Sequence, residues 1–425
     1  MFRFVHAADL HLDSPMRGLP DYEGAPIAEI RGATRAALMR LVDRTIAERA
    51  DFLLIAGDVF DGDWRDISTG LFFAQEMSRL RHAGIPVFLI RGNHDAQSRI
   101  TSTLTWPDNV TVFSAAKPAT VQLPTLNVAI HGQSFANPSV SENLAEQYPP
   151  ALPGWFNIGL LHTSLDGREG HAPYAPCTTN DLLAKNYDYW ALGHCHAREI
   201  IHAEPPILFA GNMQGRHINE ADAGGKGATL VTVDDGGGIQ LEHLVLDTVR
   251  WQRLQLAVDG IADGSALLAA MRAAVAAAKA GVDEQILALR LELTGRTALH
   301  HDLCDRQVYW RDEARLLAND IAPGEIWLER LVLKTQPELD ATQFLAREDT
   351  LGDVARALQE LAGDVGFREE LQASLKPLVS KLSDVTADDA EIAALINDQA
   401  ALDARLDETA ARLVLALAAA SDGHD

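Results

Sequence analysis

Short hydrophobic runs alternate with longer amphipathic stretches through the first 247 residues. Eight of these runs have the length of strands, and several are too uniformly apolar to leave one face in water. They cover residues 2–8, 52–56, 87–91, 128–131, 158–162, 189–192, 207–210 and 230–233. Between the early runs, residues 33–50 place Leu38, Leu41, Val42 and Ile46 on one side of a helix. The pattern predicts a layered α/β domain whose strands lie buried between layers.

The pattern changes after residue 247. The segment Asp234-Asp235-Gly236-Gly237-Gly238 is typical of a turn between strands, because residues 239–246 resemble a returning strand. The boundary of the first domain is therefore expected near residues 247–252. Beyond it lie a predicted helix at 265–280, a strand at 286–293, a helix at 301–317 and a strand at 326–333. We predict a domain at 1–247 and a small α/β module at 248–340.

Residues 341–425 show helical periodicity only. Leucines recur three or four residues apart at Leu371, Leu375, Leu378 and Leu382, and less regularly at Leu402, Leu406, Leu413 and Leu417. The simpler interpretation is a helical region that packs on its own chain. The alternative is a docking surface for the helices of a partner protein.

Composition narrows the class of protein. The chain has 425 residues, of which 47% are hydrophobic and 23% are charged, as in ordinary globular proteins. The sequence has no apolar run long enough to span a membrane, and its start does not resemble a secretory signal, so we expect a cytoplasmic protein without a membrane partner. Cys177, Cys195 and Cys304 have no CxxC spacing, which argues against a disulfide framework and against a zinc knuckle.

The charge balance argues against a nucleic-acid partner when taken alone. The 36 basic and 60 acidic residues give a net charge of −24, whereas proteins that bind nucleic acid usually present a basic face. The acid is unevenly spread, since residues 341–425 hold 7 Lys and Arg against 17 Asp and Glu. Bound metal ions would also add local positive charge that a residue count omits.

Five short motifs carry the candidate chemistry, and four of them end a hydrophobic run. They are Asp9-Leu10-His11, Gly57-Asp58, Gly92-Asn93-His94-Asp95, His162 and Gly193-His194-Cys195-His196. Carboxylate, amide and imidazole groups at strand ends can gather at one rim of a sheet. Each motif alone is common by chance, but together they supply the ligands that a hydrolytic two-metal site needs.

The spacing within the motifs suggests how two ions could be held. Asp9 and His11 stand two residues apart, so in extended backbone their side chains would leave the same face and bind one ion. His196 would complete that set. Asp58 follows a buried run and a glycine and is well placed to bridge both ions, while the second ion would take Asn93, His162 and His194.

This series of motifs resembles the calcineurin-like metallophosphoesterase superfamily. Ala8-Asp9-Leu10-His11-Leu12-Asp13 and Gly57-Asp58-Val59-Phe60-Asp61 resemble its DNA-repair nuclease branch, the bacterial SbcD-type subunits and especially the YhaO-like exonucleases. The resemblance covers roughly residues 1–247. It implies a β-sandwich flanked by helices, a small α/β capping domain at 248–340 that helps to channel DNA, and a helical tail at 341–425.

The resemblance also implies roles for single residues. Asp9, His11, Asp58 and His196 would hold one manganese, and Asp58, Asn93, His162 and His194 the other, with Mg²⁺, Fe²⁺ or Zn²⁺ as alternative metals. His94 would stay free of metal and contact the scissile phosphate or protonate the leaving oxygen, with Asp95 behind it to orient the ring. A water held by the metals would attack phosphorus in line.

One position departs from the wider family. Archaeal and eukaryotic relatives carry a histidine three residues after the bridging aspartate, where this chain has Asp61, as the bacterial type does. Asp61 is either an acceptor for a ligand histidine or a turn residue, because Asp61-Gly62-Asp63 is also a turn signal. The sequence leaves these two alternatives open.

Other residues rank lower as site candidates. We expect Cys195 to pack inward and His131 to be structural, and we expect Arg91 and Arg216 to be solvated at the surface rather than bound to phosphate. Four further histidines have no ligand-like company in the sequence: His171, His217, His300 and His301.

The function that these observations favour is a metal-dependent DNA exonuclease, with 3′ to 5′ polarity implied by the family. The sequence has no phosphate-binding Gly-x-x-x-x-Gly-Lys-[Ser/Thr] loop, so ATP dependence would require a second polypeptide. The resemblance implies an SbcC/YhaN-like ATPase with long coiled coils, and it suggests a homodimer. The alternatives are a hydrolase of small phosphoesters, such as cyclic nucleotides or a nucleotide-linked lipid precursor, and a scaffold that has lost catalysis.

Overall fold

The structure is a computed structural model that forms two compact units. It describes residues 1–14, 25–61, 67–97, 106–166, 174–283, 285–337, 342–379 and 398–422. Unit 1 comprises Met1–Leu256, Leu268–Leu293 and Val308–Val332. Unit 2 comprises Ala257–Leu267, Thr294–Gln307 and Leu333–Asp425.

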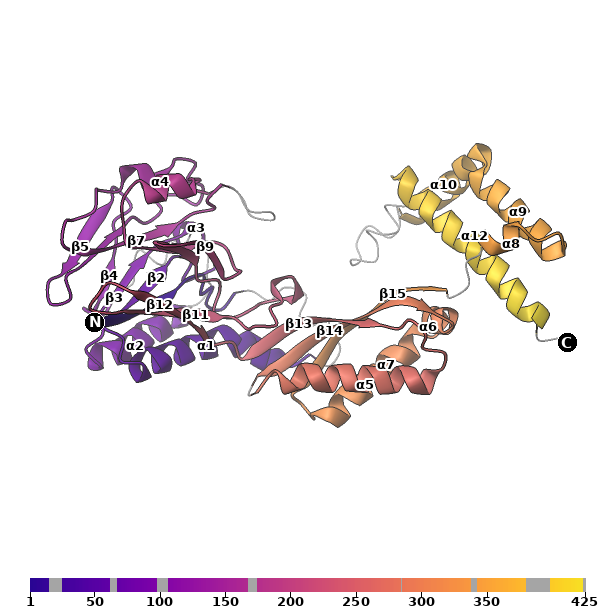
Figure 1. Cartoon of the computed structure of the whole chain (residues 1–425), viewed down its shortest axis with the longest axis horizontal. Helices are drawn as coiled ribbons and strands as arrows, with labels where there is room; N and C mark the ends of the chain where they lie inside the picture. Colours follow the sequence, from indigo (N-terminus) through magenta and orange to yellow (C-terminus); the bar gives the residue numbers. More distant parts are fainter. Residues whose placement is uncertain are drawn as a thin grey trace. The chain divides into compact units, whose positions relative to one another are not determined.

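Two six-stranded mixed sheets form the larger part of unit 1 (Figure 1). The first sheet has the order β12-β11-β1-β2-β3-β4, with β1 Phe2–Ala7, β2 Phe52–Ala56, β3 Val87–Ile90, β4 Val110–Val112, β11 Gly227–Val233 and β12 Ile239–Val245. The second has the order β5-β6-β7-β8-β10-β9, with β5 Ala119–Leu123, β6 Val128–Gly132, β7 Phe156–His162, β8 Tyr189–Gly193, β9 Glu199–Ala203 and β10 Pro206–Phe209. β1, β2, β3 and β4 run parallel, as do β6, β7, β8 and β10.

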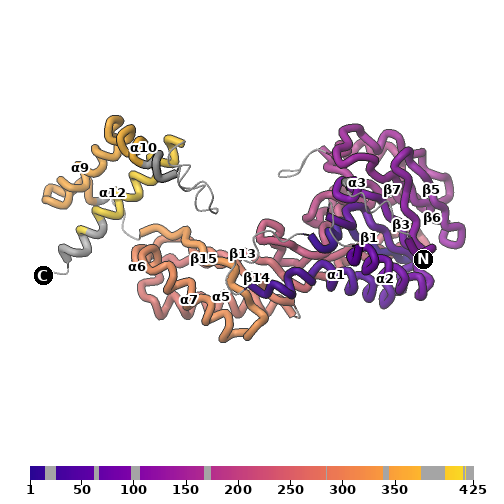
Figure 2. Tube along the Cα trace, turned by 180° about the vertical axis from the view of Figure 1, so that it is seen from behind, coloured from indigo at the N-terminus to yellow at the C-terminus, as the bar shows by residue number. Residues whose placement is uncertain are grey.

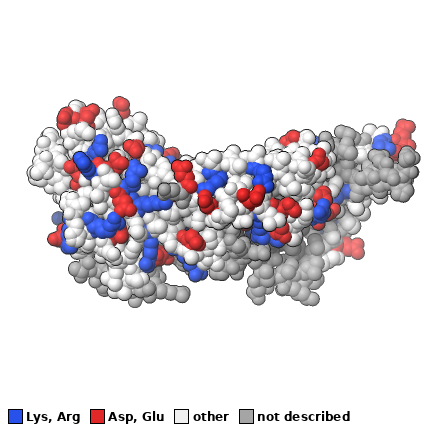
Figure 3. Space-filling model, turned by 90° about the horizontal axis from the view of Figure 1, so that it is seen from below, with Lys and Arg blue, Asp and Glu red and all other residues white. Residues whose placement is uncertain are grey.

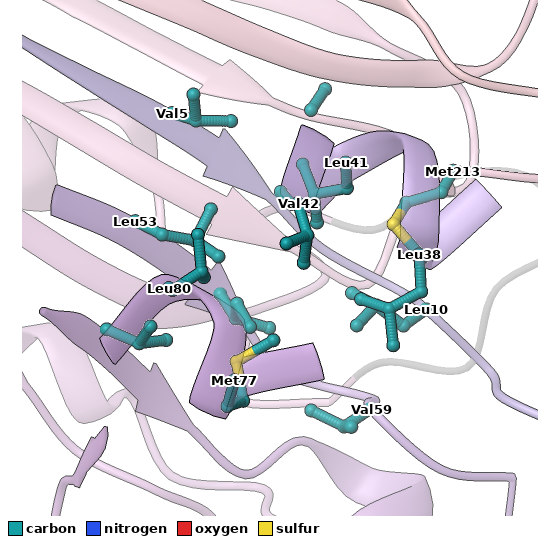
Figure 4. Close-up of a cluster of buried hydrophobic side chains, with 14 of the residues drawn as sticks. Val5, Leu10, Leu38, Leu41, Val42, Leu53, Val59, Met77, Leu80 and Met213 are labelled. Atoms are coloured by element: carbon teal, nitrogen blue, oxygen red, sulfur yellow. The ribbon is translucent and has the colours of Figure 1, made fainter. Parts of the chain in front are cut away.

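Helices cover the outer faces of these sheets. Helices α1 (Ile27–Ala47) and α2 (Ser68–His82) follow β1 and β2 and lie along one face of the first sheet (Figures 1 and 2). In α1 the buried residues recur every three or four positions, as a helix with one apolar side requires. Figure 4 shows this layer, with Val5, Leu10, Leu38, Leu41, Val42, Leu53, Val59, Met77, Leu80 and Met213 labelled.

A second core lies between the two sheets. Phe4 and Phe52 of the first sheet stack with ring centroids 4.9 Å apart, and they share a buried cluster with Ile130 and Leu160 of the second. A third cluster packs the other face of the second sheet against α4 (Thr179–Leu183) and the 3-10 helix η2 (Leu144–Gln147). Strands buried on both faces explain why the hydrophobic runs lack alternation.

The remaining elements are a three-stranded sheet and several helices. The sheet has the order β13-β14-β15, with β13 Val249–Ala257, β14 Ile286–Thr297 and β15 Ile326–Pro337. The helices are α3 Asn93–Gln97, η3 Ile218–Glu220, α5 Gly264–Ala280, α6 His300–Asp305 and α7 Gln307–Ile321, followed by α8 Thr342–Leu345, α9 Thr350–Gly363, α10 Val365–Val379 and α12 Gln399–Asp422. The helix predicted at 301–317 is thus two helices, separated at Arg306.

The predicted fold class is confirmed, with two mixed sheets, flanking helices and a helical C-terminal region. The division at residues 247 and 340 stays a prediction. Among the described residues, no helix combines the length and the apolar character needed to cross a membrane.

Candidate metal centre

The predicted ligands gather where parallel strands of both sheets end. β1, β2 and β3 of the first sheet are neighbours, and so are β7 and β8 of the second. Because the carboxyl ends of parallel strands meet at one edge, the loops that follow them converge. These loops, the end of β7 and the first residue of α3 carry Asp9, His11, Asp58, Asn93, His162, His194 and His196.

The backbone brings Asp9 and His11 together in a way that the sequence pattern did not predict. β1 ends at Ala7, and the left-handed φ angles of Asp9 (50°), His11 (42°) and Asp58 (51°) exclude the extended backbone that we expected. The Asp9 amide donates to the Gly57 carbonyl at 3.0 Å, and the His11 amide to that of Asp58 at 3.0 Å. The two loops therefore lie side by side, and the site holds conformations that are uncommon for residues other than glycine.

Two glycines permit the close approach of these loops. Gly57 has φ 96°, and a Cβ there would lie 2.5 Å from His162 Nδ1. A Cβ at Gly193 would lie 2.0 Å from the Ala56 carbonyl oxygen. Any side chain at either position would force the strand ends of the two sheets apart.

One cluster of donor atoms joins Asp9, His11 and His196, whose candidate ligand atoms lie within 4.8 Å of one another. The two Nε2 atoms of His11 and His196 face each other at 3.1 Å. The Asp9 carboxylate also accepts the His194 backbone N–H, at 3.0 and 3.1 Å from its two oxygens. This is the donor set that the sequence predicted for the first ion, apart from Asp58.

A second cluster lies beside the first and includes Asp58. His162 Nε2 lies 3.0 Å from Asn93 Oδ1 and 3.5 Å from Asp58 Oδ2, and Asp9, Asp58 and His162 form another group within 4.8 Å. Asp58 Oδ2 also lies 4.0 Å from His11 Nε2. Asp58 is thus within reach of both clusters, as a bridging ligand must be. The buried His194 ring lies beside His162, with centroids 5.3 Å apart.

The charges of this buried cluster fit divalent cations. Burial, followed by the charge of Arg216, lowers the pKa of His11 to about 4 and so keeps the ring in its neutral, ligating form. Burial would lower the pKa of His162, but the charge of Asp58 and a hydrogen bond to it raise that pKa to about 9. Burial raises the pKa of Asp9 to about 6. A shared cation would stabilise carboxylates and imidazoles that are buried this close to one another.

The imidazole pair gives the most specific test of that fit. His196 Nδ1 lies 2.8 Å from Glu220 Oε1, so this nitrogen carries the proton and Nε2 offers a lone pair. His11 Nδ1 lies 3.7 Å from Asp61 Oδ1, beyond hydrogen-bond distance, and this buried nitrogen has no hydrogen-bond partner among the described residues. The Nε2 atoms of His11 and His196 face each other at 3.1 Å, so a cation beside them could take both as ligands.

Two protein families match the chain. Residues 2–198 match the calcineurin-like phosphoesterase family, and residues 251–336 match the middle domain of the metallophosphoesterase YhaO. The chain carries a calcineurin-like metallophosphoesterase domain. This fold uses a dinuclear metal centre, and the clustered donors of this metallophosphoesterase domain fit one.

Individual relatives agree with the family. The metallophosphoesterase YhaO of Bacillus subtilis is 40% identical over 254 residues, which cover 59% of this chain and 62% of that protein. The DNA double-strand break repair protein Mre11 of Sulfurisphaera tokodaii is 27% identical, over 54% of this chain and 59% of its own length. That of Saccharolobus solfataricus is 27% identical, over 60% and 66%. The chain therefore spans about three fifths of the length of the curated relatives that it matches.

His94 is more exposed than the histidines that we expect to bind metal. Its side chain is 35% exposed, whereas those of His11 and His162 are 1% and 0% exposed. Its proximity to His11 and Asp58 would also allow it to bind metal, since the three form a group within 4.8 Å. Exposure and the partner of its ring are therefore what single it out.

The partner of the His94 ring is Asp61. Asp61 Oδ1 lies 2.7 Å from His94 Nδ1, and its other oxygen accepts the Ser14 hydroxyl at 2.5 Å. Burial would lower the pKa of His94, but the hydrogen bond to Asp61 and the charges of Asp58 and Asp61 raise it. Of the two interpretations that the sequence left open, these contacts favour an acceptor, but for His94, which we predicted to be free of metal, rather than for a ligand histidine.

Asp95 has a different set of contacts from the one we expected. Its carboxylate accepts the backbone N–H groups of Val59, Phe60 and Gly92 at 2.9 to 3.2 Å. Burial and the charge of Asp58 raise the pKa of Asp95 to about 7. Asp95 thus ties the loop after β2 to the loop after β3, and the orienting role predicted for it is better supported for Asp61.

Some of the remaining predictions agree with the structure, and one does not. Cys195 packs inward in the cluster beneath α4, and His131 is buried between Thr120 and Asn157, both as predicted. The surface position predicted for Arg216 is wrong, since its side chain is only 13% exposed and is ion-paired. His171 lies outside the described residues.

Two buried residues near the site were missed in the sequence. Glu220 contacts His196, and His6 hydrogen-bonds Tyr189 and the Leu192 carbonyl behind the strand ends. His6 lies inside a hydrophobic run, where a polar residue is unusual, and that signal could have indicated a buried partner. Glu220 gives no such signal, because it is an ordinary charged residue at the end of the short helix η3.

Proposed function

We propose that this chain hydrolyses phosphodiester bonds in DNA with two divalent cations and acts as an exonuclease. The observation that carries the proposal is the convergence of the predicted ligands from five separate segments around Asp58, with His94 at the exposed side. The choice of DNA as the substrate is supported by the similarity to Mre11 proteins, whose names state a role in DNA double-strand break repair.

The ligands divide between the two ions as the motifs suggest. Asp9, His11, Asp58 and His196 would hold one ion, and Asp58 would share the other with Asn93, His162 and His194. Cations bound there would offset the negative charge of the phosphate and lower the pKa of water to the neutral range. We propose Mn²⁺ as the metal, since mixed imidazole and carboxylate donors suit it.

His94 and Asp61 would handle the proton. Because the Nδ1–H of His94 donates to Asp61, its Nε2 is left for the substrate. The hydrogen bond to Asp61 and the nearby carboxylates raise the pKa of His94 and so favour the protonated ring, whose Nε2–H can donate to a phosphate oxygen or to the leaving oxygen. Asp61 stabilises the charged ring and holds its orientation.

The acidic charge of the chain bears on how tightly it would bind DNA. On the face shown in Figure 3, Lys and Arg side chains lie interspersed with Asp and Glu. Basic residues of α1 and α2 are already paired, such as Arg44 with Glu48 and Arg79 with Asp43. We therefore expect modest DNA affinity that falls as the salt concentration rises.

Incubating the purified chain with labelled single- and double-stranded DNA, and with a small diester such as bis(p-nitrophenyl) phosphate, tests the substrate. We expect shortening of DNA from its 3′ ends with Mn²⁺ and none with excess chelator. Hydrolysis of the small diester without cleavage of either DNA would instead favour a hydrolase of small phosphoesters. The absence of any Mn²⁺-dependent hydrolysis would contradict both.

The C-terminal helices suggest a partner. In unit 2, Phe344, Ala355 and Val414 form a small buried cluster, while Leu413 and Leu417 on α12 are 48% and 47% exposed. Apolar side chains exposed on a helix are typical of a docking surface. We propose that this region binds a coiled-coil ATPase of the SbcC/YhaN type, that residues 248–340 help to channel DNA, and that two copies of the chain pair.

A further inference from the structure

Glu220 lies directly behind one of the proposed metal ligands. Its Oε1 accepts the Nδ1–H of His196 at 2.8 Å, and its Oε2 accepts the Asn212 side-chain amide at 3.0 Å and the Arg216 backbone N–H at 2.8 Å. Both oxygens of the carboxylate are therefore engaged.

Arg216 joins this carboxylate to the catalytic side of the site. Its Nη2 lies 2.7 Å from Glu220 Oε1 and 3.3 Å from His196 Nδ1, and its Nε lies 3.2 Å from Glu220 Oε1. Its Nη1 lies 3.4 Å from Asp61 Oδ2 and 3.4 Å from Ser14 Oγ. One guanidinium thus contacts the carboxylate behind His196 and the carboxylate that holds His94.

The segment that carries Arg216 and Glu220 is anchored through the two residues that precede Arg216. The Gly215 carbonyl accepts the indole N–H of Trp251 at 3.0 Å and the Gln214 side-chain amide at 2.9 Å. Gln214 also donates to the Val249 carbonyl at 2.7 Å and accepts the Thr248 amide at 2.8 Å. A loop held this firmly can maintain side-chain positions to the tolerance that metal ligation requires.

We propose that Glu220 and Arg216 are positioning residues that hold His196 in the tautomer and orientation that bind a divalent cation, and that tie this ligand to Asp61 behind His94. The inference rests on the proposed function only in that the site holds metal. A carboxylate on the far nitrogen of a ligating imidazole leaves Nε2 as the donor and strengthens it. Arg216 prevents that carboxylate from rotating away.

The alternative role for Arg216 is a direct contact with the substrate phosphate. All three of its guanidinium nitrogens already have partners within the chain, and its side chain is 13% exposed. A bidentate phosphate contact would break at least one of these pairs. The geometry therefore assigns Arg216 to positioning.

A Mn²⁺ titration of the metal-free full-length chain tests the inference without relying on catalysis. The signal of free Mn²⁺ in electron paramagnetic resonance gives the amount that remains unbound. Glu220→Gln keeps the shape and removes the charge. We expect the dissociation constant of one ion to rise about 10- to 100-fold and that of the other to stay within about twofold. The matched control is Asp222→Asn, the same change two positions away on a half-exposed side chain, which should bind both ions as the parent does.

Glu220→Gln leaves Arg216 as a buried charge with a weakened partner, which could destabilise the fold. A second variant controls for this effect. The double variant Glu220→Gln/Arg216→Met removes both charges, and we expect it to lose affinity for the same ion. Parental affinity for both ions in the folded single or double variant would overturn the role of Glu220. A raised KM for DNA in Arg216→Met, with both ions bound as in the parent, would overturn that of Arg216.

These outcomes are separate from the fate of the proposed substrate. If the parent chain binds two Mn²⁺ ions but cuts no DNA, the proposed nuclease function fails, whereas the predicted difference between the parent and Glu220→Gln can still be measured and confirmed. If the parent binds no Mn²⁺, both proposals are wrong.

Discussion

Replacing Asp61 with asparagine isolates what this carboxylate does for His94. The substitution replaces one carboxylate oxygen with an amide NH₂ group and removes the negative charge. It keeps the size of the side chain, which is 15% exposed. Asp61 Oδ1 lies 2.7 Å from His94 Nδ1, a short distance for a charge-assisted hydrogen bond. In Asp61→Asn the ring loses its charged acceptor, so its protonated form is less stable and its orientation less constrained.

The size of the effect follows from that one interaction. A hydrogen bond to a charged group contributes about 1.5 to 3 kcal/mol. If Asp61 acts by stabilising the protonated ring in the transition state, removing its charge should cost a similar activation free energy. At about 1.36 kcal/mol per factor of ten, kcat should fall roughly 10- to 150-fold.

The assay is steady-state hydrolysis of a DNA substrate with saturating Mn²⁺, together with metal content measured by mass spectrometry. Metal content is needed because Asp61 also lies 3.7 Å from His11. We expect Asp61→Asn to retain both ions. Asp222→Asn again serves as the charge-matched control and should leave kcat unchanged.

A double-mutant cycle provides the decisive comparison. If Asp61 acts through His94, then adding Asp61→Asn to His94→Asn should change kcat by less than about threefold, because the interaction is already lost. If the double variant instead loses the full factor seen in the parent, the two residues act independently. That result would refute the reasoning.

Three further predictions follow from other parts of the structure. His94→Asn should keep both metal ions and lower kcat by about 10²- to 10⁴-fold, the range for a general acid, and full activity would show that His94 takes no part. Burial lowers the pKa of His6 to about 3, so His6 stays neutral in the folded chain while the unfolded chain binds a proton below pH 6.5, and stability is lost as pH falls from 6.5 towards 3. Between pH 7 and pH 5, His6 should lower the free energy of unfolding by about 2 kcal/mol. Urea unfolding in the presence of chelator should show that His6→Gln loses about 2 kcal/mol less stability than the parent over this pH range. An equal pH dependence in both proteins would contradict the assignment. Deleting residues 342–425 should leave cleavage of short DNA within about twofold but abolish co-purification with an SbcC-like ATPase, and survival of the complex would place the docking surface elsewhere.

Much of the site could be predicted from the chain alone, for a local reason. Hydrophobic runs identify buried strands, and parallel strands bring their carboxyl ends to one edge whatever the details of their loops. Polar groups placed just after such runs, such as Asp9, Asp58 and Asn93, must then lie near one another. The ligand types and their order along the chain were enough to predict a two-metal site, and the resemblance of the motifs to a known family indicated the phosphoesterase fold.

Contacts between loops were a different matter, because their partners are far apart in sequence and no periodicity encodes them. Asp95 adjoins His94 in the chain but contacts backbone amides, while Asp61, 33 residues earlier, contacts the ring. Glu220 lies 24 residues from His196 and is an unremarkable acid in the sequence. The sequence by itself determined which groups could bind metal and at which edge of the sheets they would meet. Only the tertiary structure decided which carboxylate orients which imidazole, because a hydrogen bond depends on positions within a few tenths of an ångström that only the packed loops define.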